Sequence, residues 1–280
     1  MTIWTDLLGA QVRHVDAGGV RTRILTMGDG PPVLALHGRG GHLETFARTV
    51  PALATRHTVV AADLLGHGLT EIVGDDFAVP HLAMHVLDLM DALDLGTPAL
   101  LGQSLGGWVA AHLAIEAPAR VARLALIEPA GLQTEQERFA DPAVRAAADT
   151  GGRAYAEPTP AAVRARFAGL VHDPAAIDDE IVAVRQLLYA PPEARTVHLA
   201  VRAADNTAAV LTPQRLAAIS APTLLVHGES GHLPADVLEL AARTIPRCRL
   251  LVVPGTKQWP QYEDPDVVNA ELIRFLEEPT

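Results

Sequence analysis

The chain has 280 residues, of which 49% are hydrophobic and 20% are charged, a composition typical of a folded globular protein. The net charge of −11 is spread without acidic or basic blocks, which argues against nucleic acid or an anionic membrane as a partner. The only cysteine, Cys248, excludes an intrachain disulfide. Because the chain shows no leader-like N-terminus and no apolar run of about 18 residues, we expect a cytoplasmic protein.

The first half of the chain predicts strands that alternate with helices. Alternating polarity indicates a hairpin formed by Gln11–Asp16 and Val20–Met27. Short apolar runs predict buried strands at Val33–Leu36, Thr58–Ala62, Pro98–Leu101 and Val121–Ile127. Helical spacing of apolar residues predicts helices at Leu43–Leu53, His81–Leu93 and Gly106–Ala117. This alternation predicts a parallel sheet with right-handed crossovers.

The rhythm changes in residues 131–219, which contain no convincing strand. Helical patterns occur at Pro142–Ala148, Pro160–Val171, Ala175–Tyr189 and Ala194–Ala204. The strand and helix pattern then resumes with Thr223–His227, Ala235–Thr244, Arg249–Val253 and Pro265–Glu277. We therefore expect an α/β core of residues 1–130 and 220–280, and an all-helical cap of residues 131–219.

A single serine stands at the junction between a predicted strand and a predicted helix. The segment Gly102–Gly106 reads Gly-Gln-Ser-Leu-Gly and fits G-x-S-x-G, the nucleophile elbow. Glycine is needed two residues on either side because the strained serine backbone leaves no room for a Cβ atom. The alternative is a glycine-rich turn with a passive serine, but the strand and helix on either side favour an elbow at Ser104.

Four segments resemble sequences typical of the α/β-hydrolase fold, and the resemblance covers nearly the whole chain. They are the oxyanion loop His37–Gly41, the D-x-x-G-H-G loop Asp63–Gly68, the elbow Gly102–Gly107, and Val253–Gly255 before the loop that usually carries the catalytic histidine. The resemblance implies a mostly parallel eight-stranded sheet with a helical cap inserted after the sixth strand.

Within that superfamily the predicted cap resembles that of C–C bond hydrolases acting on ring-cleavage products, and of related esterases and lactonases. Arg185, Gln103 and Trp259 fit this group. The resemblance implies that these residues and Gly38 bind substrate. The expected activity is hydrolysis of an ester, lactone or C–C bond in a mostly apolar small molecule.

The mechanism that the resemblance implies begins with attack by Ser104 on a carbonyl. The amides of Leu105 and Arg39 hold the oxyanion, and a histidine activates the serine. No cofactor is required, and no cluster of side chains has metal-ligand spacing. A homodimer is the default expectation for the oligomeric state.

The residue in the histidine slot is Gln258, which aligns without a gap. Glutamine accepts no proton, so the protein as written should bind substrate and turn it over slowly. Two alternatives stay open. The chain is a ligand-binding or non-hydrolytic relative that has lost the triad, or Gln258 replaces a histidine in order to trap a ligand. His42 and His232 are the other histidines placed to act as a base.

The acid is also irregular, because Gly231 occupies the slot where the family has aspartate after the seventh strand. Glu128, directly after the predicted sixth strand, is the preferred acid, and Glu229 is the reserve. A buried carboxylate needs partners to stay ionised. We therefore predict that Glu128, and neither Glu229 nor Asp236, bonds the Gln258 side chain, and that Gln258 also accepts from the Ser104 hydroxyl.

Overall fold

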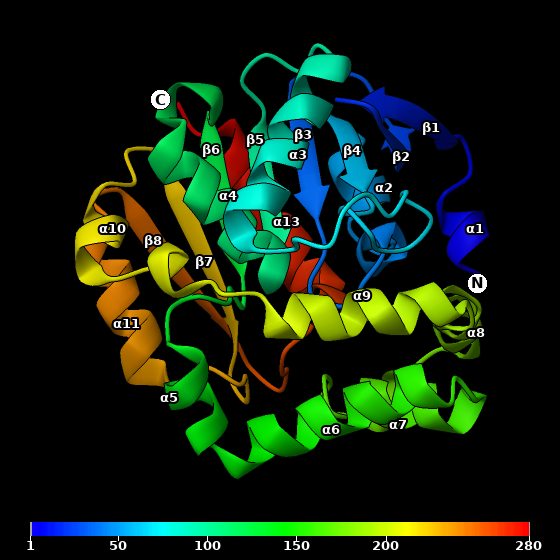
Figure 1. The fold of residues 1–280 in the computed structure, drawn as a ribbon. Helices are drawn as coiled ribbons and strands as arrows, with labels where there is room; N and C mark the ends of the chain where they lie inside the picture. Colours follow the sequence, from blue (N-terminus) through cyan, green and yellow to red (C-terminus); the bar gives the residue numbers. More distant parts are fainter. Residues whose placement is uncertain (1, 280) are drawn as a thin grey trace.

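A computed structural model describes residues 2–279 as one eight-stranded sheet covered by helices (Figure 1). The strands are β1 Gln11–Ala17, β2 Val20–Met27, β3 Pro32–Leu36, β4 Thr58–Ala62, β5 Ala99–Gln103, β6 Arg123–Ile127, β7 Thr223–Gly228 and β8 Cys248–Val253. Their spatial order is β1-β2-β4-β3-β5-β6-β7-β8. The pairs β1–β2 and β2–β4 are antiparallel and every other pair is parallel, which confirms the predicted mostly parallel sheet.

Two hydrophobic cores lie on opposite faces of the sheet, because successive residues of a strand point to opposite sides. In β3, Leu34 and Leu36 join the core under α3 and α4, whereas Val33 and Ala35 join the core under α2 and α13. The helices outside the β6–β7 connection are α1 Ile3–Asp6, α2 Val50–Leu53, α3 Val79–Ala92, α4 Leu105–Glu116, α11 Ala235–Thr244, α12 Pro260–Glu263 and α13 Pro265–Glu277.

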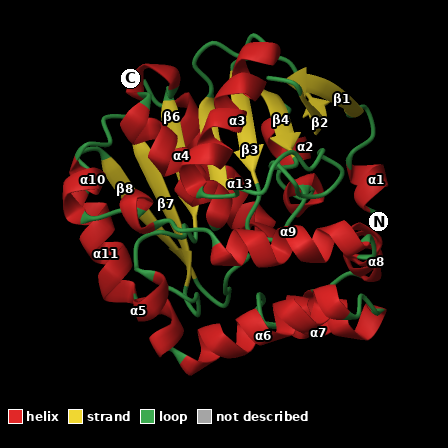
Figure 2. Ribbon diagram, in the orientation of Figure 1, coloured by secondary structure: helices red, strands yellow, loops and turns green. Residues whose placement is uncertain are grey.

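The β6–β7 connection consists of helices joined by loops and has no strand, and we call residues 131–219 the cap. Its α-helices are α5 Glu135–Ala140, α6 Pro142–Ala156, α7 Pro160–Ala168, α8 Asp179–Tyr189, α9 Pro192–Ala203 and α10 Pro213–Ala217. Figure 2 shows α9 crossing below the strands, with α6 and α7 beyond it. Aromatic rings join these layers, since Tyr155 of α6 stacks between Tyr189 of α8 and His198 of α9.

One predicted helix is wrong. The segment Leu43–Leu53 is broken into a 3-10 turn, Leu43–Phe46, and the short helix α2. Pro51 explains the break, because proline has no N–H to donate to the carbonyl four residues earlier. Within residues 2–279, no helix combines the length and the apolar character needed to cross a membrane.

Candidate active site

The strained residue predicted at position 104 is present. Ser104 joins β5 directly to α4 and has φ 52° and ψ −111°, a region that costs a non-glycine residue roughly 1–3 kcal/mol. Main-chain hydrogen bonds hold it there. Its N–H donates to the Ile127 carbonyl at 2.9 Å, and its carbonyl accepts from the Ala130 N–H at 2.9 Å. The neighbouring strand end therefore fixes the turn on which the serine stands.

The glycines on either side of the serine are required by space. A Cβ atom on Gly102 would lie 2.4 Å from the Gly106 carbonyl oxygen, and one on Gly106 would lie 2.1 Å from the Leu36 carbonyl oxygen. Both obstacles are backbone atoms, which cannot move aside as a side chain can. The steric argument made from the G-x-S-x-G pattern is therefore confirmed.

A cavity of about 90 Å³ between core and cap contains Ser104 in its wall. It collects all the predicted site residues except Glu128, namely Gly38, Arg39, Gln103, Ser104, Leu105, Arg185, Gln258 and Trp259. The oxyanion loop lies close to the serine, since a Cβ atom on Gly38 would be 3.0 Å from the Ser104 Cβ and 2.3 Å from the Gln103 Oε1. The sequence thus located the cavity from segments far apart in the chain.

Gln258 is buried in this cavity but does not make the predicted contacts. Its Nε2 donates to the main-chain carbonyl of Glu128 at 3.4 Å, and its Oε1 is buried without a hydrogen-bond partner. The predicted bond to the Glu128 carboxylate and the predicted bond from Ser104 are therefore both absent. On the main chain, the Gln258 carbonyl accepts from Gln103 Nε2 at 3.2 Å.

Glu128 is buried and does not line the cavity. Other groups hold its carboxylate. Its Oε1 accepts hydrogen bonds from the Gly228 N–H at 2.7 Å and from His227 Nδ1 at 2.6 Å. Its Oε2 is buried without a partner. Burial raises the pKa of Glu128, against the opposing effect of His227 and the Gly228 amide. Glu128 has φ 45°, a left-handed conformation that turns the side chain along the strand ends.

Gly231 leaves the space that this carboxylate occupies. A Cβ atom on Gly231 would lie 2.3 Å from Glu128 Oε1 and 2.8 Å from its Cδ. The glycine in the usual aspartate slot and the glutamate at the end of β6 thus fit together as a pair. The two alternative acids lie elsewhere. Glu229 accepts from the Gly255 N–H at 3.0 Å, and Asp236 is exposed on α11.

His227 is the partner that the sequence analysis missed. The sequence predicts only a buried strand, Thr223–His227, at this position. A histidine at the end of the strand next to Glu128 would have indicated a partner for its carboxylate, because Ile127 pairs with Val226. His227 is buried and does not line the cavity that holds Ser104. The bond between Glu128 and His227 therefore supports the strand ends.

The two histidines considered as replacement bases differ in position. His232 lines the cavity, and burial together with the charge of Lys257 lowers its pKa to about 4. His42 does not line it. His42 is fully buried, with Nδ1 2.8 Å from Glu44 Oε2 and Nε2 accepting from the Arg185 Nε at 3.3 Å. Because the arginine can only donate, His42 carries its proton on Nδ1 and donates to Glu44.

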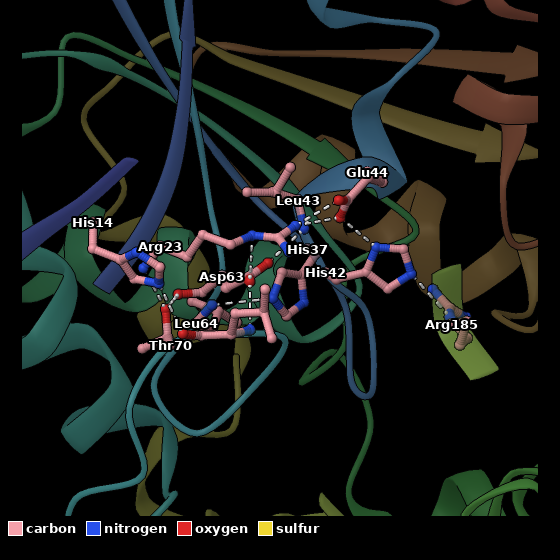
Figure 3. Close-up of polar contacts among 11 residues, drawn as sticks. His14, Arg23, His37, His42, Leu43, Glu44, Asp63, Leu64, Thr70 and Arg185 are labelled. Carbon is pink, nitrogen blue, oxygen red and sulfur yellow. Dashed lines mark hydrogen bonds and ion pairs between the residues drawn. The ribbon is translucent and has the colours of Figure 1, made fainter. Parts of the chain in front are cut away.

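Arg185 is held at the cavity by a buried polar network that reaches back into the core (Figure 3). It is 1% exposed, and its guanidinium lies over the rings of Phe167 at 4.3 Å and Trp259 at 5.0 Å. Behind His42, Glu44 pairs with Arg23 of β2 at 2.6 Å. A second bond joins the same cap helix to the oxyanion loop, since the Tyr189 hydroxyl donates to the Gly40 carbonyl at 2.7 Å.

The cavity is more cationic than the expected mostly apolar substrate requires. Five arginines line it, namely Arg39, Arg138, Arg166, Arg185 and Arg202. The sequence did not indicate this charge because these residues are distributed over the oxyanion loop and four cap helices, and their convergence depends on how those helices pack. Within residues 2–279, no group of three or more His, Cys, Asp or Glu side chains is arranged to hold a metal ion.

The sheet order, the strained serine after β5 and the helical connection over the strand ends define an α/β hydrolase architecture. The family described as alpha/beta hydrolase fold matches residues 31–265. The chain belongs to this family, and its fold is shared with solved C–C bond hydrolases. The structure of 2-hydroxy-6-oxo-6-phenylhexa-2,4-dienoate hydrolase from Rhodococcus sp. strain RHA1 superimposes with a TM-score of 0.82 at 24% identity, covering 96% of this chain and 99% of that one.

Two curated relatives match along most of this chain. The 2-hydroxy-6-oxo-6-(2'-aminophenyl)hexa-2,4-dienoic acid hydrolase of Metapseudomonas resinovorans is 28% identical, covering 93% of this chain and 89% of that protein. The dihydrolipoyllysine-residue acetyltransferase component of the acetoin cleaving system of Pseudomonas putida is 30% identical, covering 96% of this chain and 70% of that protein. The relatives thus carry more than one activity.

Proposed function

We propose that the protein is a hydrolase whose nucleophile is Ser104 and whose substrate is a small molecule with an ester, a lactone or a C–C bond next to a carbonyl. The observation that carries this proposal is the φ of 52° at Ser104, beside a cavity and at the start of α4. Strain of this kind persists only where the surrounding structure enforces it. The hydrolase from M. resinovorans supports the C–C bond among these three substrates. A homodimer and a cytoplasmic location stay predictions.

The proposed first step is attack of the Ser104 Oγ on the substrate carbonyl. The charge that develops on the carbonyl oxygen is stabilised by the N–H groups of Leu105 and Arg39, aided by the positive N-terminal end of α4. Arg185, Gln103, Gly38 and Trp259 line the same cavity and orient the substrate. The intermediate then collapses, which breaks the ester, lactone or C–C bond and releases the leaving group with the proton that the Ser104 hydroxyl gives up. Water hydrolyses the resulting acyl-serine, releasing the acid and returning a proton to the serine oxygen.

Gln258 limits this chemistry because it transfers no proton. Removal of the histidine from another serine hydrolase lowers turnover about 10⁶-fold, which corresponds to roughly 8 kcal/mol of barrier. The serine, the amides and the cavity persist in this chain, so binding is retained while turnover is slow. Glu128 would orient a base at position 258, but its carboxylate is already bonded to His227 and Gly228.

The substitution Gln258→His tests the proposal through hydrolysis of an activated ester and labelling of Ser104 by a serine-directed phosphonate. Loss of the acid alone costs a triad enzyme about 10⁴-fold, against about 10⁶-fold for loss of the histidine. Because the Glu128 carboxylate is held elsewhere, we expect Gln258→His to raise both readouts about 10²-fold. The exposed Gln214→His is the matched control and should change neither, and adding Ser104→Ala to Gln258→His should abolish both gains.

The second candidate is a binding protein without hydrolytic activity, and the bonds of Glu128 favour it. His227 and Gly228 hold the Glu128 Oε1, and the Gln258 side chain bonds the main-chain carbonyl of Glu128 instead of its carboxylate. If Gln258→His folds normally and raises neither ester hydrolysis nor labelling of Ser104, the binding function replaces the hydrolase.

A further inference from the structure

Two arginines of the cap converge on one turn of α6. Arg166 of α7 donates to the Ala147 carbonyl at 3.2 Å, and Arg202 of α9 donates to the Ala148 carbonyl at 3.2 Å. These carbonyls belong to consecutive residues, so both guanidinium groups are held at the same place on the cavity wall. In residues 2–279 neither forms an ion pair with a carboxylate.

The cavity has more arginines than carboxylates to pair with them. Arg39 and Arg138 share one carboxylate, Glu135, with each ion pair at 3.2 Å. Arg185 has no ion pair within the described residues and has a buried Nη2 without a partner. Among the described residues, three guanidinium groups without a carboxylate partner therefore line one small cavity in a protein of net charge −11. Such groups repel one another and need anions to be stable.

His198 lines the same cavity as Arg166 and Arg202. It is 8% exposed, and both of its ring nitrogens are buried without a hydrogen-bond partner. Burial, followed by the charges of Arg202 and Arg166, lowers the pKa of His198 to about 3, so the ring is neutral at pH 7. A neutral ring still has one N–H to donate, and a ligand oxygen in the cavity would satisfy it.

We propose that the cavity takes a substrate with two acidic groups, one at Arg185 and the other at Arg166, Arg202 and His198. The reaction of this substrate rests on the hydrolase function proposed above, whereas its binding does not. The second group is either a carboxylate or a phosphate, since both accept charge-assisted hydrogen bonds from guanidinium groups. Both positions line the same cavity of about 90 Å³.

Isothermal titration of the unaltered protein tests the inference without turnover. The probes are glutarate and adipate as dicarboxylates, pentanoate and hexanoate as monocarboxylates of matched length, and 4-phosphobutanoate for a terminal phosphate group. We expect the preferred ligand with two acidic groups to bind at least tenfold more tightly than pentanoate or hexanoate. Arg166→Gln and Arg202→Gln should each remove most of that preference and leave monoanion binding unchanged. Arg202→Lys, which keeps the charge, should retain part of it.

The exposed Arg195→Gln, on the same helix as Arg202, removes one charge away from the cavity and is the matched control. Preference for the dicarboxylates assigns a carboxylate to the second position, and preference for the phosphate compound assigns a phosphate. Equal binding of ligands with one and with two acidic groups, or a preference that survives both glutamine variants in the folded state, overturns the inference. Labelling of Ser104 in Gln258→His is scored separately, so failure of the hydrolase function is distinguished from failure of this one.

Discussion

The fit between Gly231 and Glu128 predicts a strong energetic coupling between two positions that are 103 residues apart in sequence. The perturbation is Gly231→Ala, made alone and in the Glu128→Ala background. Position 231 has no positive φ, so its backbone accepts alanine. Space is the only obstacle, because the new Cβ atom would lie 2.3 Å from Glu128 Oε1. Real Cβ atoms do not approach so closely, and the carboxylate must therefore move.

The cost follows from the bonds that the carboxylate gives up. Moving away from Gly231 breaks its hydrogen bonds with the Gly228 N–H at 2.7 Å and His227 Nδ1 at 2.6 Å. A hydrogen bond to a charged group contributes roughly 1.5–3 kcal/mol, and partial relaxation keeps part of this. We expect Gly231→Ala to destabilise the protein by about 3 kcal/mol. In the Glu128→Ala background the same change should cost less than about 1 kcal/mol.

Urea unfolding followed by circular dichroism measures the four free energies of this double-mutant cycle. The expected coupling of about 2 kcal/mol or more lies within the range found for residues in contact. Gly152→Ala serves as the matched control, since a Cβ atom there meets open space. Additive costs for Gly231→Ala and Glu128→Ala would refute the reasoning, because they would mean that the carboxylate does not occupy the space above Gly231.

Two further predictions follow from the elbow and from the buried histidines. Gly106→Ala should lower the free energy of unfolding by about 3 kcal/mol or more, because its Cβ atom would lie 2.1 Å from the Leu36 carbonyl oxygen. In the Gln258→His background it should also abolish labelling of Ser104, and unchanged labelling would contradict the steric account. Burial lowers the pKa of His42 from 6.5 to about 4, against the hydrogen bond to Glu44, so the unfolded chain binds this proton between those pH values and the folded chain does not. Protonation of His42 in the unfolded chain should therefore lower the free energy of unfolding by up to about 3 kcal/mol as the pH falls from 6.5 to 4. Urea unfolding at both pH values should show a smaller loss in His42→Gln, whereas the half-buried His81→Gln should behave like the unaltered protein.

Most of the sheet and the position of the serine could be predicted because they depend on local patterns. Apolar runs placed β4 at the observed bounds, and the glycines around Ser104 indicated the strained turn. Segments that resemble family motifs then located the cavity. Leu43–Leu53 shows the limit of periodicity, because its apolar spacing was helical while Pro51 removed a hydrogen-bond donor.

The details of the site could not be predicted because they depend on contacts between distant residues. The orientation of Glu128 follows from φ 45° and from two donors on the adjacent strand, and no local pattern shows either. The convergence of Arg166 and Arg202 requires α6, α7 and α9 to pack together. The sequence therefore indicated which residues were candidates, and the tertiary packing decided which of them touch.

The contacts of α8 have a consequence for movement of the cap. Arg185 and Tyr189 lie one helical turn apart, and they bond His42 and Gly40, which belong to or directly follow the oxyanion loop. Raising α8 to admit or release a ligand must break both bonds or carry that loop along. In the first case the loop loses two contacts that hold it in the observed structure, and in the second case it moves with the helix. The position of the loop that carries Arg39 is therefore coupled to the position of α8, through one contact on each side of a single helical turn.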